Sequence, residues 1–243
     1  MTNVQGYLDD PLVLLPGMMC DARVFGPQID ALSTVAAVTV APITRGERIE
    51  EIASGLLDLL PARFALAGLS MGGIVAMEIL RRAPDRVSRL ALLDTNALAE
   101  TPASAAAYEP LVIKARSGSL AEVAGAMIGP GTLAPGACRP DVMKLMAEMA
   151  EHVGGAAVVR QIRALQRRQD YQATLRRCRV PALVLCGAHD TLTPPRRHEL
   201  MAALIPGAEL EVVEDAGHLP TLETPDAVTR ALAGWAARRP APQ

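Results

Sequence analysis

Aromatic side chains are scarce in this chain of 243 residues, where Phe, Trp and Tyr together make up 2%. A pocket walled by stacked rings is therefore not expected, and aliphatic and methionine side chains should line any ligand pocket. An excess of charge of one sign is also lacking, because the net charge is −2. This near-neutral balance predicts no nucleic-acid partner and no anionic membrane surface.

Long apolar runs and paired cysteine spacings are lacking too. No stretch approaches the roughly 20 apolar residues that a membrane-spanning helix needs, and no basic segment followed by an apolar run opens the sequence, as a secretory signal requires. The four cysteines show no CxxC spacing, so we expect reduced thiols and a cytoplasmic protein. Without a Walker loop, zinc spacing or dinucleotide fingerprint, no cofactor and no metal are expected.

Short apolar runs alternate with longer helical patterns, which is typical of a parallel sheet with helices on both faces. The apolar runs predict strands at Pro11–Pro16, Ala37–Ala41, Phe64–Leu69, Leu90–Asp94, Ala182–Gly187 and Leu210–Val213. Helices are predicted at Val24–Leu32, Arg48–Leu60, Met71–Arg82, Pro195–Leu204 and Ala227–Ala236. The expected fold class is α/β, with a doubly wound, mostly parallel sheet.

The alternation of strand and helix patterns stops between Thr95 and Cys178, where the chain is rich in alanine and methionine. Helical patterns there cover Ala105–Ala115, Leu120–Ile128, Pro140–His152 and Ala156–Gln169, separated by joints rich in glycine and proline. We interpret the region as a helical cap inserted between two strands, above the edge of the sheet where ligands bind. The predicted organisation is a core in two parts, residues 1–95 and 178–243, with a cap of residues 96–177.

The stretch LAGLSMGGIVAMEIL, residues 66–80, begins as a buried strand and ends as a helix, with three glycines around Ser70 at the junction. A Gly-x-Ser-x-Gly turn between a strand and a helix holds the serine in a strained bend that exposes its hydroxyl. The alternative is that the glycines only permit close packing. The position of the motif at a predicted strand-to-helix junction favours Ser70 as a nucleophile.

A serine hydroxyl needs a base to remove its proton. His218 lies in the loop after the last predicted strand, which returns to the edge of the sheet where Ser70 is expected. His152 and His198 fall within helical patterns among charged neighbours and are predicted to be surface residues. His189 directly precedes an aspartate, and adjacent side chains project differently, so both cannot easily serve one centre. His218 is therefore the candidate base.

The base in turn needs a carboxylate to orient it. Asp190 follows a predicted strand end, and the chain order Ser70, Asp190, His218 is the one expected of this kind of fold. Asp94, at the end of the strand in ALLDTN, is the competing acid.

Acyl transfer also requires donors for the oxygen of a tetrahedral intermediate. The backbone N–H of Met71, directly after the nucleophile, is one candidate. The sharp exit Pro16-Gly17 after the first strand leaves the N–H of Met18 free to be the other. The side chains of Met19 and Leu219 are expected to line the substrate pocket.

Four ordered landmarks, LLPGMM, GLSMGG, GAHDTLTPP and DAGHLPTLETP, resemble the α/β-hydrolases over nearly the whole chain. Within that superfamily the sequence is similar to the small bacterial esterase, enol-lactonase and carrier-protein methyl ester esterase group. The resemblance implies a nucleophile, base, acid and oxyanion donors at Ser70, His218, Asp190, Met18 and Met71, with a helical cap between the sixth and seventh strands of the family.

Two departures from that group are visible. Pro16-Gly17 stands where most relatives have His-Gly, which puts the outer wall of the oxyanion loop in doubt. The chain is also short before Pro11, which predicts a trimmed six-strand sheet or an extra strand around Val4–Tyr7.

The leading functional hypothesis is a serine hydrolase that cleaves a small or aliphatic carboxylic ester, or a thioester, through an acyl-enzyme. Its partner would be a small-molecule ester. Lactone opening, C–C bond hydrolysis and acyl transfer by the same residues are the alternatives, and a ligand receptor that hydrolyses little is a third reading. Arg160, Arg163, Arg167 and Arg168 of the cap could clamp a carboxylate, but helical geometry predicts a solvated charged face for the first three.

Overall fold

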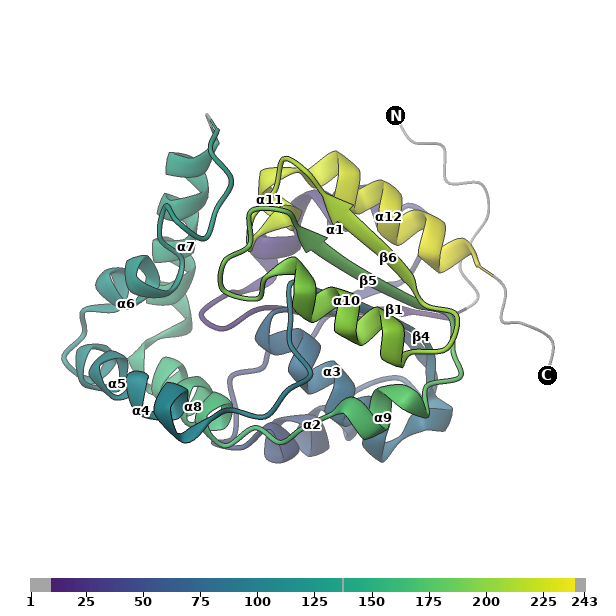
Figure 1. Ribbon diagram of the computed structural model, residues 1–243, viewed down its shortest axis with the longest axis horizontal. Coiled ribbons are helices and arrows are strands. Elements are labelled where there is room, and N and C mark those ends of the chain that lie inside the picture. The colour runs from purple at the N-terminus through teal and green to yellow at the C-terminus, as the bar shows by residue number, and fades with distance from the viewer. Residues whose placement is uncertain (1–9, 137, 239–243) are drawn as a thin grey trace.

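The computed structural model describes residues 10–136 and 138–238, which contain a six-stranded parallel sheet in the order β2-β1-β3-β4-β5-β6 (Figure 1). The strands are β1 (Leu12–Leu15), β2 (Val38–Val40), β3 (Phe64–Leu69), β4 (Val87–Leu93), β5 (Ala182–Gly187) and β6 (Glu209–Val213). The predicted α/β fold class with a parallel sheet is confirmed. The segment around Val4–Tyr7 lies outside the described residues.

Burial differs between the centre and the edges of the sheet. Strands β1, β3 and β5 are buried at every position, and β4 at all but one, which explains their continuous apolar runs. Strand β6 is different, because Leu210 and Val212 each leave 36% of their surface exposed. Its apolar sequence suggested two covered faces, but β6 is an edge strand and one of its faces is partly open to solvent.

Helices cover both faces of the sheet (Figure 1). Helices α1 (Gly26–Leu32) and α12 (Pro225–Ala237) pack together on one face, while α2 (Ile49–Leu57), α3 (Met71–Arg82) and α10 (Pro195–Leu204) cover the other. The bounds of α3 and α10 are those that the sequence predicted. Four short helices had no predicted counterpart of their own: η1 (Ala22–Phe25), η2 (Pro84–Arg86), α9 (Gln172–Arg176) and α11 (Pro220–Glu223).

In the described part of the chain between β4 and Tyr171, five helices stand beyond the carboxyl ends of the strands (Figure 1). They are α4 (Pro102–Ala107), α5 (Glu109–Arg116), α6 (Leu120–Met127), α7 (Arg139–Val153) and α8 (Gly155–Gln166). The predicted helical cap insertion is thereby confirmed. The single helix expected over Ala105–Ala115 is two helices that meet at Tyr108, because Pro110 lacks the N–H that a continuing helix would use.

The arginine face of α8 is not simply solvated as the sequence suggested. Arg160 donates through Nε to the carbonyl oxygen of Thr44 at 3.1 Å, and Arg167 pairs with Glu47 at 3.6 Å. The loop after β2 therefore packs against this face, and the arginines help to join the cap to the core. Within the described residues, no helix combines the length and hydropathy needed to cross a membrane.

Candidate active site

The site lies where the sheet order changes direction. Strands β2 and β3 flank β1, so the loops after β1 and β3 diverge at the carboxyl edge and leave a crevice between them. Ser70 follows β3 directly and precedes the first residue of α3. The parallel sheet thus brings the Ser70 turn and the Pro16-Gly17 loop to one point, beneath the cap.

Backbone strain is concentrated at this point. Met19, Ser70 and Asp94 have φ values of 62°, 52° and 41°, and among the described residues they are the non-glycine residues with positive φ. Gly72 has no room for a side chain, since a Cβ there would overlap the carbonyl oxygen of Leu15. Such conformations persist only where surrounding structure enforces them, and they cluster at functional sites.

Hydrogen bonds from β4 and the residues that follow it hold the strained turn. The Ser70 N–H donates to the carbonyl oxygen of Leu93 at 2.9 Å, and the Thr95 hydroxyl donates to the carbonyl oxygen of Ser70 at 2.7 Å. The Thr95 N–H donates to Nε2 of His198 at 2.9 Å. Both the N–H and the carbonyl group of Ser70 at the strained turn are therefore held by neighbouring residues.

His198 is fully buried, so its predicted surface position is wrong. The inner face of α10 packs against β5 and brings the imidazole to Thr95. Burial lowers the pKa of His198 to about 4, which keeps the ring neutral and leaves Nε2 able to accept this hydrogen bond.

Ser70, His218 and Asp190 form a continuous hydrogen-bonded chain. The Ser70 Oγ lies 2.9 Å from His218 Nε2, and His218 Nδ1 lies 2.8 Å from Asp190 Oδ2. The imidazole is 1% exposed and Asp190 is 2% exposed. Because ionised Asp190 can only accept, Nδ1 carries the proton and Nε2 is free to accept from the serine hydroxyl.

Asp190 is held in its ionised form by its partners. Its Oδ1 accepts from the N–H groups of Leu192 and Thr193 at 2.8 and 2.9 Å, and its Oδ2 accepts from the Thr193 hydroxyl at 2.5 Å. Burial by itself would raise the pKa of Asp190, but the neighbouring His218 and the Thr193 hydrogen bonds outweigh it and hold that pKa well below its usual range.

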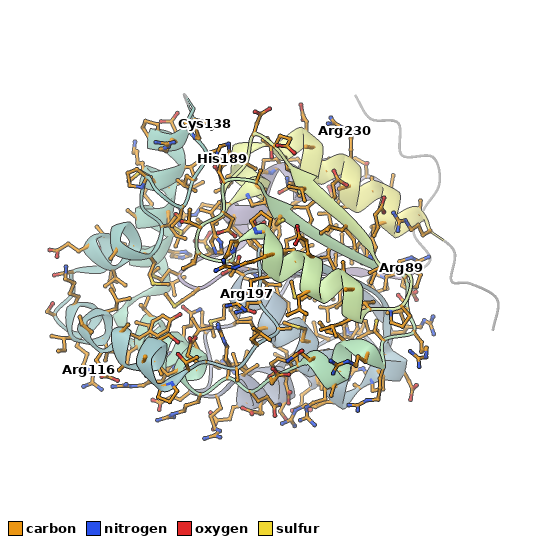
Figure 2. All side chains as sticks on the ribbon, viewed as in Figure 1. Arg89, Arg116, Cys138, His189, Arg197 and Arg230 are labelled. Atoms are coloured by element: carbon orange, nitrogen blue, oxygen red, sulfur yellow. The ribbon has the colours of Figure 1, made fainter. Side chains whose placement is uncertain are left out.

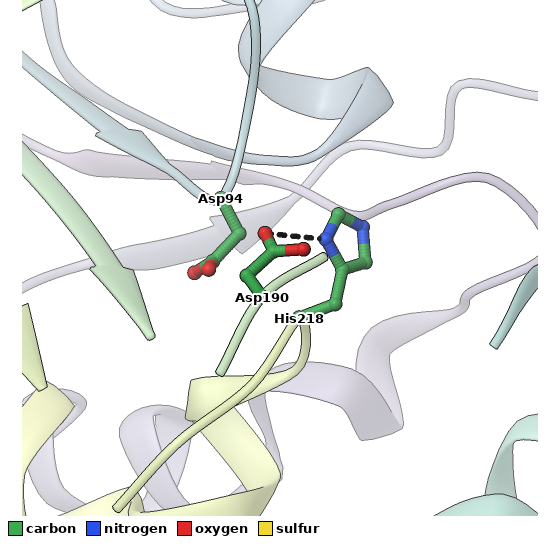
Figure 3. Close-up of side chains that lie close together, drawn as sticks. All are labelled: Asp94, Asp190 and His218. Carbon is green, nitrogen blue, oxygen red and sulfur yellow. Dashed lines mark hydrogen bonds and ion pairs between the residues drawn. The ribbon is translucent and has the colours of Figure 1, made fainter. Parts of the chain in front are cut away.

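Asp94 lies on the far side of Asp190 from His218 (Figure 3). Its Oδ1 accepts from the Gly187 N–H at 2.9 Å, and its side chain is fully buried. Burial, reinforced by the negative charge of Asp190, raises the pKa of Asp94 well above its usual value. No hydrogen bond joins Asp94 to His218 within the described part of the chain, whereas Asp190 makes one.

Asp94, Asp190 and His218 each place one potential metal-ligand atom within 4.8 Å of the others. The donor set is a poor fit for an ion, however. Both oxygens of Asp190 already accept two hydrogen bonds each, and both ring nitrogens of His218 are engaged. The arrangement is that of a proton-transfer chain with a neighbouring acid.

The remaining histidines lie apart from this chain. His189 is exposed on the surface (Figure 2), while its neighbour Asp190 points inward, so the two project differently as expected. His152 is 74% exposed and its Nδ1 lies 2.8 Å from a carboxylate oxygen of Asp21.

The two candidate oxyanion donors flank Ser70. No acceptor for the N–H of Met18 or Met71 is found among residues 10–136 and 138–238. The next N–H along the loop, that of Met19, donates to Oε1 of Gln161 at 3.0 Å, and the Gln161 amide donates to the carbonyl oxygen of Ile43 at 3.2 Å. Gln161 is a fully buried residue of the cap helix α8 that fixes the loop, and no sequence pattern around it indicates this role.

Glu223 performs a similar task for the histidine loop. Its carboxylate accepts from the N–H groups of Gly217 and Leu219, on either side of His218, at 3.0 and 2.9 Å, and from the N–H of Ala134 at 2.7 Å. Ala134 belongs to the cap region, so Glu223 joins the cap to the histidine loop. The sequence does not indicate this role of Glu223, because a carboxylate that caps a loop leaves no recognisable spacing.

A small cavity and a larger one open beside Ser70. The smaller holds about 20 Å³, room for a single water-sized group, and both predicted pocket residues, Met19 and Leu219, line it together with His218. The larger holds about 340 Å³. Its lining combines apolar side chains from both parts of the molecule with a polar region: Met18, Met71, Ile74, Tyr108, Met127, Leu165, Asn96, Glu100, Arg168, Arg196 and Arg197.

The chain belongs to the alpha/beta hydrolase family, whose model matches residues 12–231. Comparison with solved structures agrees with this assignment. A thermophilic esterase from Thermogutta terrifontis, solved with malate bound, superposes with a TM-score of 0.84 at 28% identity, over 95% of this chain and 90% of that one. An enol-lactonase from Burkholderia xenovorans superposes with a TM-score of 0.83 at 26% identity, over 95% and 92%.

Two of the sequence relatives are each 31% identical to this chain. A pimeloyl-[acyl-carrier protein] methyl ester esterase of Aromatoleum aromaticum is 31% identical over 194 residues, which cover 75% of this chain and 77% of the relative. An uncharacterized protein of Mycobacterium tuberculosis is 31% identical over 198 residues, 71% of this chain. The match covers only 57% of the length of that mycobacterial protein.

Proposed function

We propose that this protein is a serine hydrolase that cleaves a carboxylic ester or thioester through an acyl-enzyme. The observation that carries the proposal is the hydrogen-bonded chain from Ser70 through His218 to Asp190, held at a strained turn beside a cavity. Similarity to esterases supports it. Residues 96–177 would form the cap over this site, with the rest of the chain as the core.

In the first half of the reaction, His218 Nε2 takes the proton of Ser70 as Oγ attacks the ester carbonyl carbon. The carbonyl oxygen becomes an oxyanion, to which the N–H groups of Met18 and Met71 would donate. When the intermediate collapses, the bond to the alcohol oxygen breaks. His218 gives its proton to that oxygen, so a neutral alcohol leaves and the acyl group stays on Ser70.

In the second half, His218 removes a proton from water as the water oxygen attacks the acyl carbon. Collapse of the second tetrahedral intermediate returns the proton to Ser70 Oγ and releases the carboxylic acid. Asp190 keeps its negative charge throughout, since its low pKa prevents protonation. Its role is to hold the His218 tautomer and to stabilise the imidazolium in both halves.

The two cavities suggest how an ester would divide between them. A space of about 20 Å³ beside Ser70 accommodates a group no larger than a methyl, while about 340 Å³ accommodates a longer chain. We therefore infer a small-molecule ester with one short alkyl side and one extended, mainly aliphatic side.

Lactone opening is the second candidate, favoured by the similarity to an enol-lactonase. An enol-lactone is a cyclic ester, so the same residues would perform the same two steps, with the leaving oxygen still tethered to the acyl group.

The test is hydrolysis of p-nitrophenyl acetate and butyrate by the wild type and Ser70→Ala. We expect steady turnover in the wild type and a loss of several orders of magnitude in the variant. Ser117→Ala, at an exposed serine of the cap, is the matched control and should behave as the wild type. A fluorophosphonate should phosphonylate the Ser70 hydroxyl with release of HF, so the wild type should gain the mass of the phosphonyl group and Ser70→Ala should gain none. Equal rates in wild type and Ser70→Ala would remove Ser70 as the nucleophile.

A further inference from the structure

Charge is distributed unevenly in the larger cavity. Three arginines, Arg168, Arg196 and Arg197, line it, against one carboxylate, Glu100. Glu100 already pairs with Arg168 at 3.1 Å, and both of these side chains are nearly buried, with 8% and 11% of their surface exposed. Among the residues that the structure describes, no carboxylate lies within 4.0 Å of Arg196 or Arg197. The lining therefore has two guanidinium groups in excess.

Arg196 and Arg197 both lie at the N-terminal end of their helix, where a positive charge destabilises the helix. They are in the first turn of α10, which starts at Pro195, and the positive end of a helix dipole disfavours cations. This turn has no acidic residue and no capping side chain. Its charges and the helix dipole thus add rather than cancel, which creates a local positive potential that an anion would relieve.

Of the two arginines, Arg197 is better placed to bind an anion inside the cavity. It is half-buried, whereas Arg196 is exposed. Arg197 lies at the end of α10 nearest the cap helices, while other arginines such as Arg230 lie on the outer surface (Figure 2). Because Arg197 shares its cavity with Ser70, an occupant that reaches the guanidinium can also reach the nucleophile.

We propose that Arg197, assisted by Arg196 and the first turn of α10, forms an anion subsite for a carboxylate on the substrate. The substrate class is then a monoester of an aliphatic dicarboxylic acid, with its ester at Ser70 and its free carboxylate at Arg197. A planar guanidinium binds a carboxylate through two parallel hydrogen bonds. This assignment rests on the proposed esterase activity and adds the chemistry of the distant end of the substrate.

The apolar part of the cavity fits the middle of such a molecule. Ile74 and Leu165 are among its lining residues and would contact the methylene chain. The chain length that bridges Ser70 and Arg197 would be preferred over shorter and longer ones, since both ends must be occupied at once.

The experiment compares kcat/KM for methyl monoesters of dicarboxylic acids, from succinate to suberate, with that for methyl alkanoates of equal chain length. We expect the wild type to prefer the monoester at one optimal length. Arg197→Gln should lower this preference by about tenfold or more, the loss typical of a hydrogen bond to a charged group. Arg197→Lys, which keeps the charge without the planar fork, should retain part of it.

Arg230→Gln on α12 is the matched control and should leave the preference unchanged. A preference of the wild type for the neutral ester at every length would overturn the subsite. Equal effects of Arg197→Gln and Arg230→Gln would also overturn it. Failure of the esterase proposal is distinguishable, because it would appear as turnover of neutral esters that survives in Ser70→Ala.

Discussion

Replacement of Asp94 by asparagine tests the electrostatics beside the proposed active site. Asp94 is fully buried next to ionised Asp190, with one oxygen of each carboxyl group within 4.8 Å. Two negative charges at that separation would repel each other by about 3.5 kcal/mol at an effective dielectric constant of about 20. Together with burial, this repulsion keeps Asp94 protonated while Asp190 carries the charge.

The sign of the stability effect follows from the protons bound in each state. In the unfolded chain Asp94 loses its proton near pH 4, whereas in the folded protein it keeps it to higher pH. At a pH between the unfolded and the folded pKa of Asp94, the folded state binds one more proton than the unfolded state. Each unit by which the pH rises within that interval therefore lowers the free energy of unfolding by about 1.4 kcal/mol.

Asparagine removes this dependence while it preserves the local contacts. Its amide oxygen can accept from the Gly187 N–H as Asp94 Oδ1 does, and its NH₂ group can face Asp190. Asparagine also tolerates the positive φ of 41° at this position. We therefore expect Asp94→Asn to gain stability relative to the wild type as pH rises above the usual aspartate pKa, at up to about 1.4 kcal/mol per pH unit.

Urea unfolding of both proteins at several pH values measures this gain. Ester hydrolysis provides the second readout, in which Asp94→Asn should keep its kcat within a few-fold of the wild type. Asp190→Asn should lose about 10⁴-fold, because the carboxylate that orients the histidine is gone. The reasoning is refuted if the stability difference does not depend on pH, or if Asp94→Asn loses as much activity as Asp190→Asn.

Two further substitutions probe the turn and the histidine loop. Gly72→Ala should lower Tm by several degrees in thermal unfolding, because its Cβ would overlap the carbonyl oxygen of Leu15 and overpacking costs about 1–3 kcal/mol. An unchanged Tm would contradict this and show that the turn around Ser70 can accommodate a methyl group. Glu223→Gln should lower kcat/KM by about tenfold, because an amide leaves one of the three N–H groups around His218 without an acceptor. Assays of ester turnover would contradict this if kcat/KM stayed at the wild-type value.

The sequence was informative where a local pattern determines the structure. The strained turn around Ser70 requires a fixed spacing of small residues, so it could be found from the sequence. The continuous apolar runs of β3 and β5 indicate burial on both faces, so these strands could be found in the same way. The fold class and the cap insertion followed from the order of such patterns. Asp190 and His218 could be nominated because each follows a predicted strand.

Other features depend on contacts between distant segments and had no local signal. Gln161 and Glu223 bind backbone N–H groups far away in the chain, and neither lies in a pattern that predicts a partner. His198 looked like a surface residue, because its neighbours in sequence are charged and its burial depends on how α10 packs against the sheet. Helix α11, with four residues, is too short for a periodic signal.

The hydrogen bond that the Met19 N–H donates to Gln161 Oε1 means that the cap cannot be exchanged independently of the core. A cap transplanted from another member of the family, without an amide at this position, would release the loop beside Ser70. Cap exchange should therefore succeed only when the glutamine and its contact with Ile43 are transferred as a unit. In protein engineering, the boundary between the core and an exchanged cap should therefore be placed within α8 rather than at its ends.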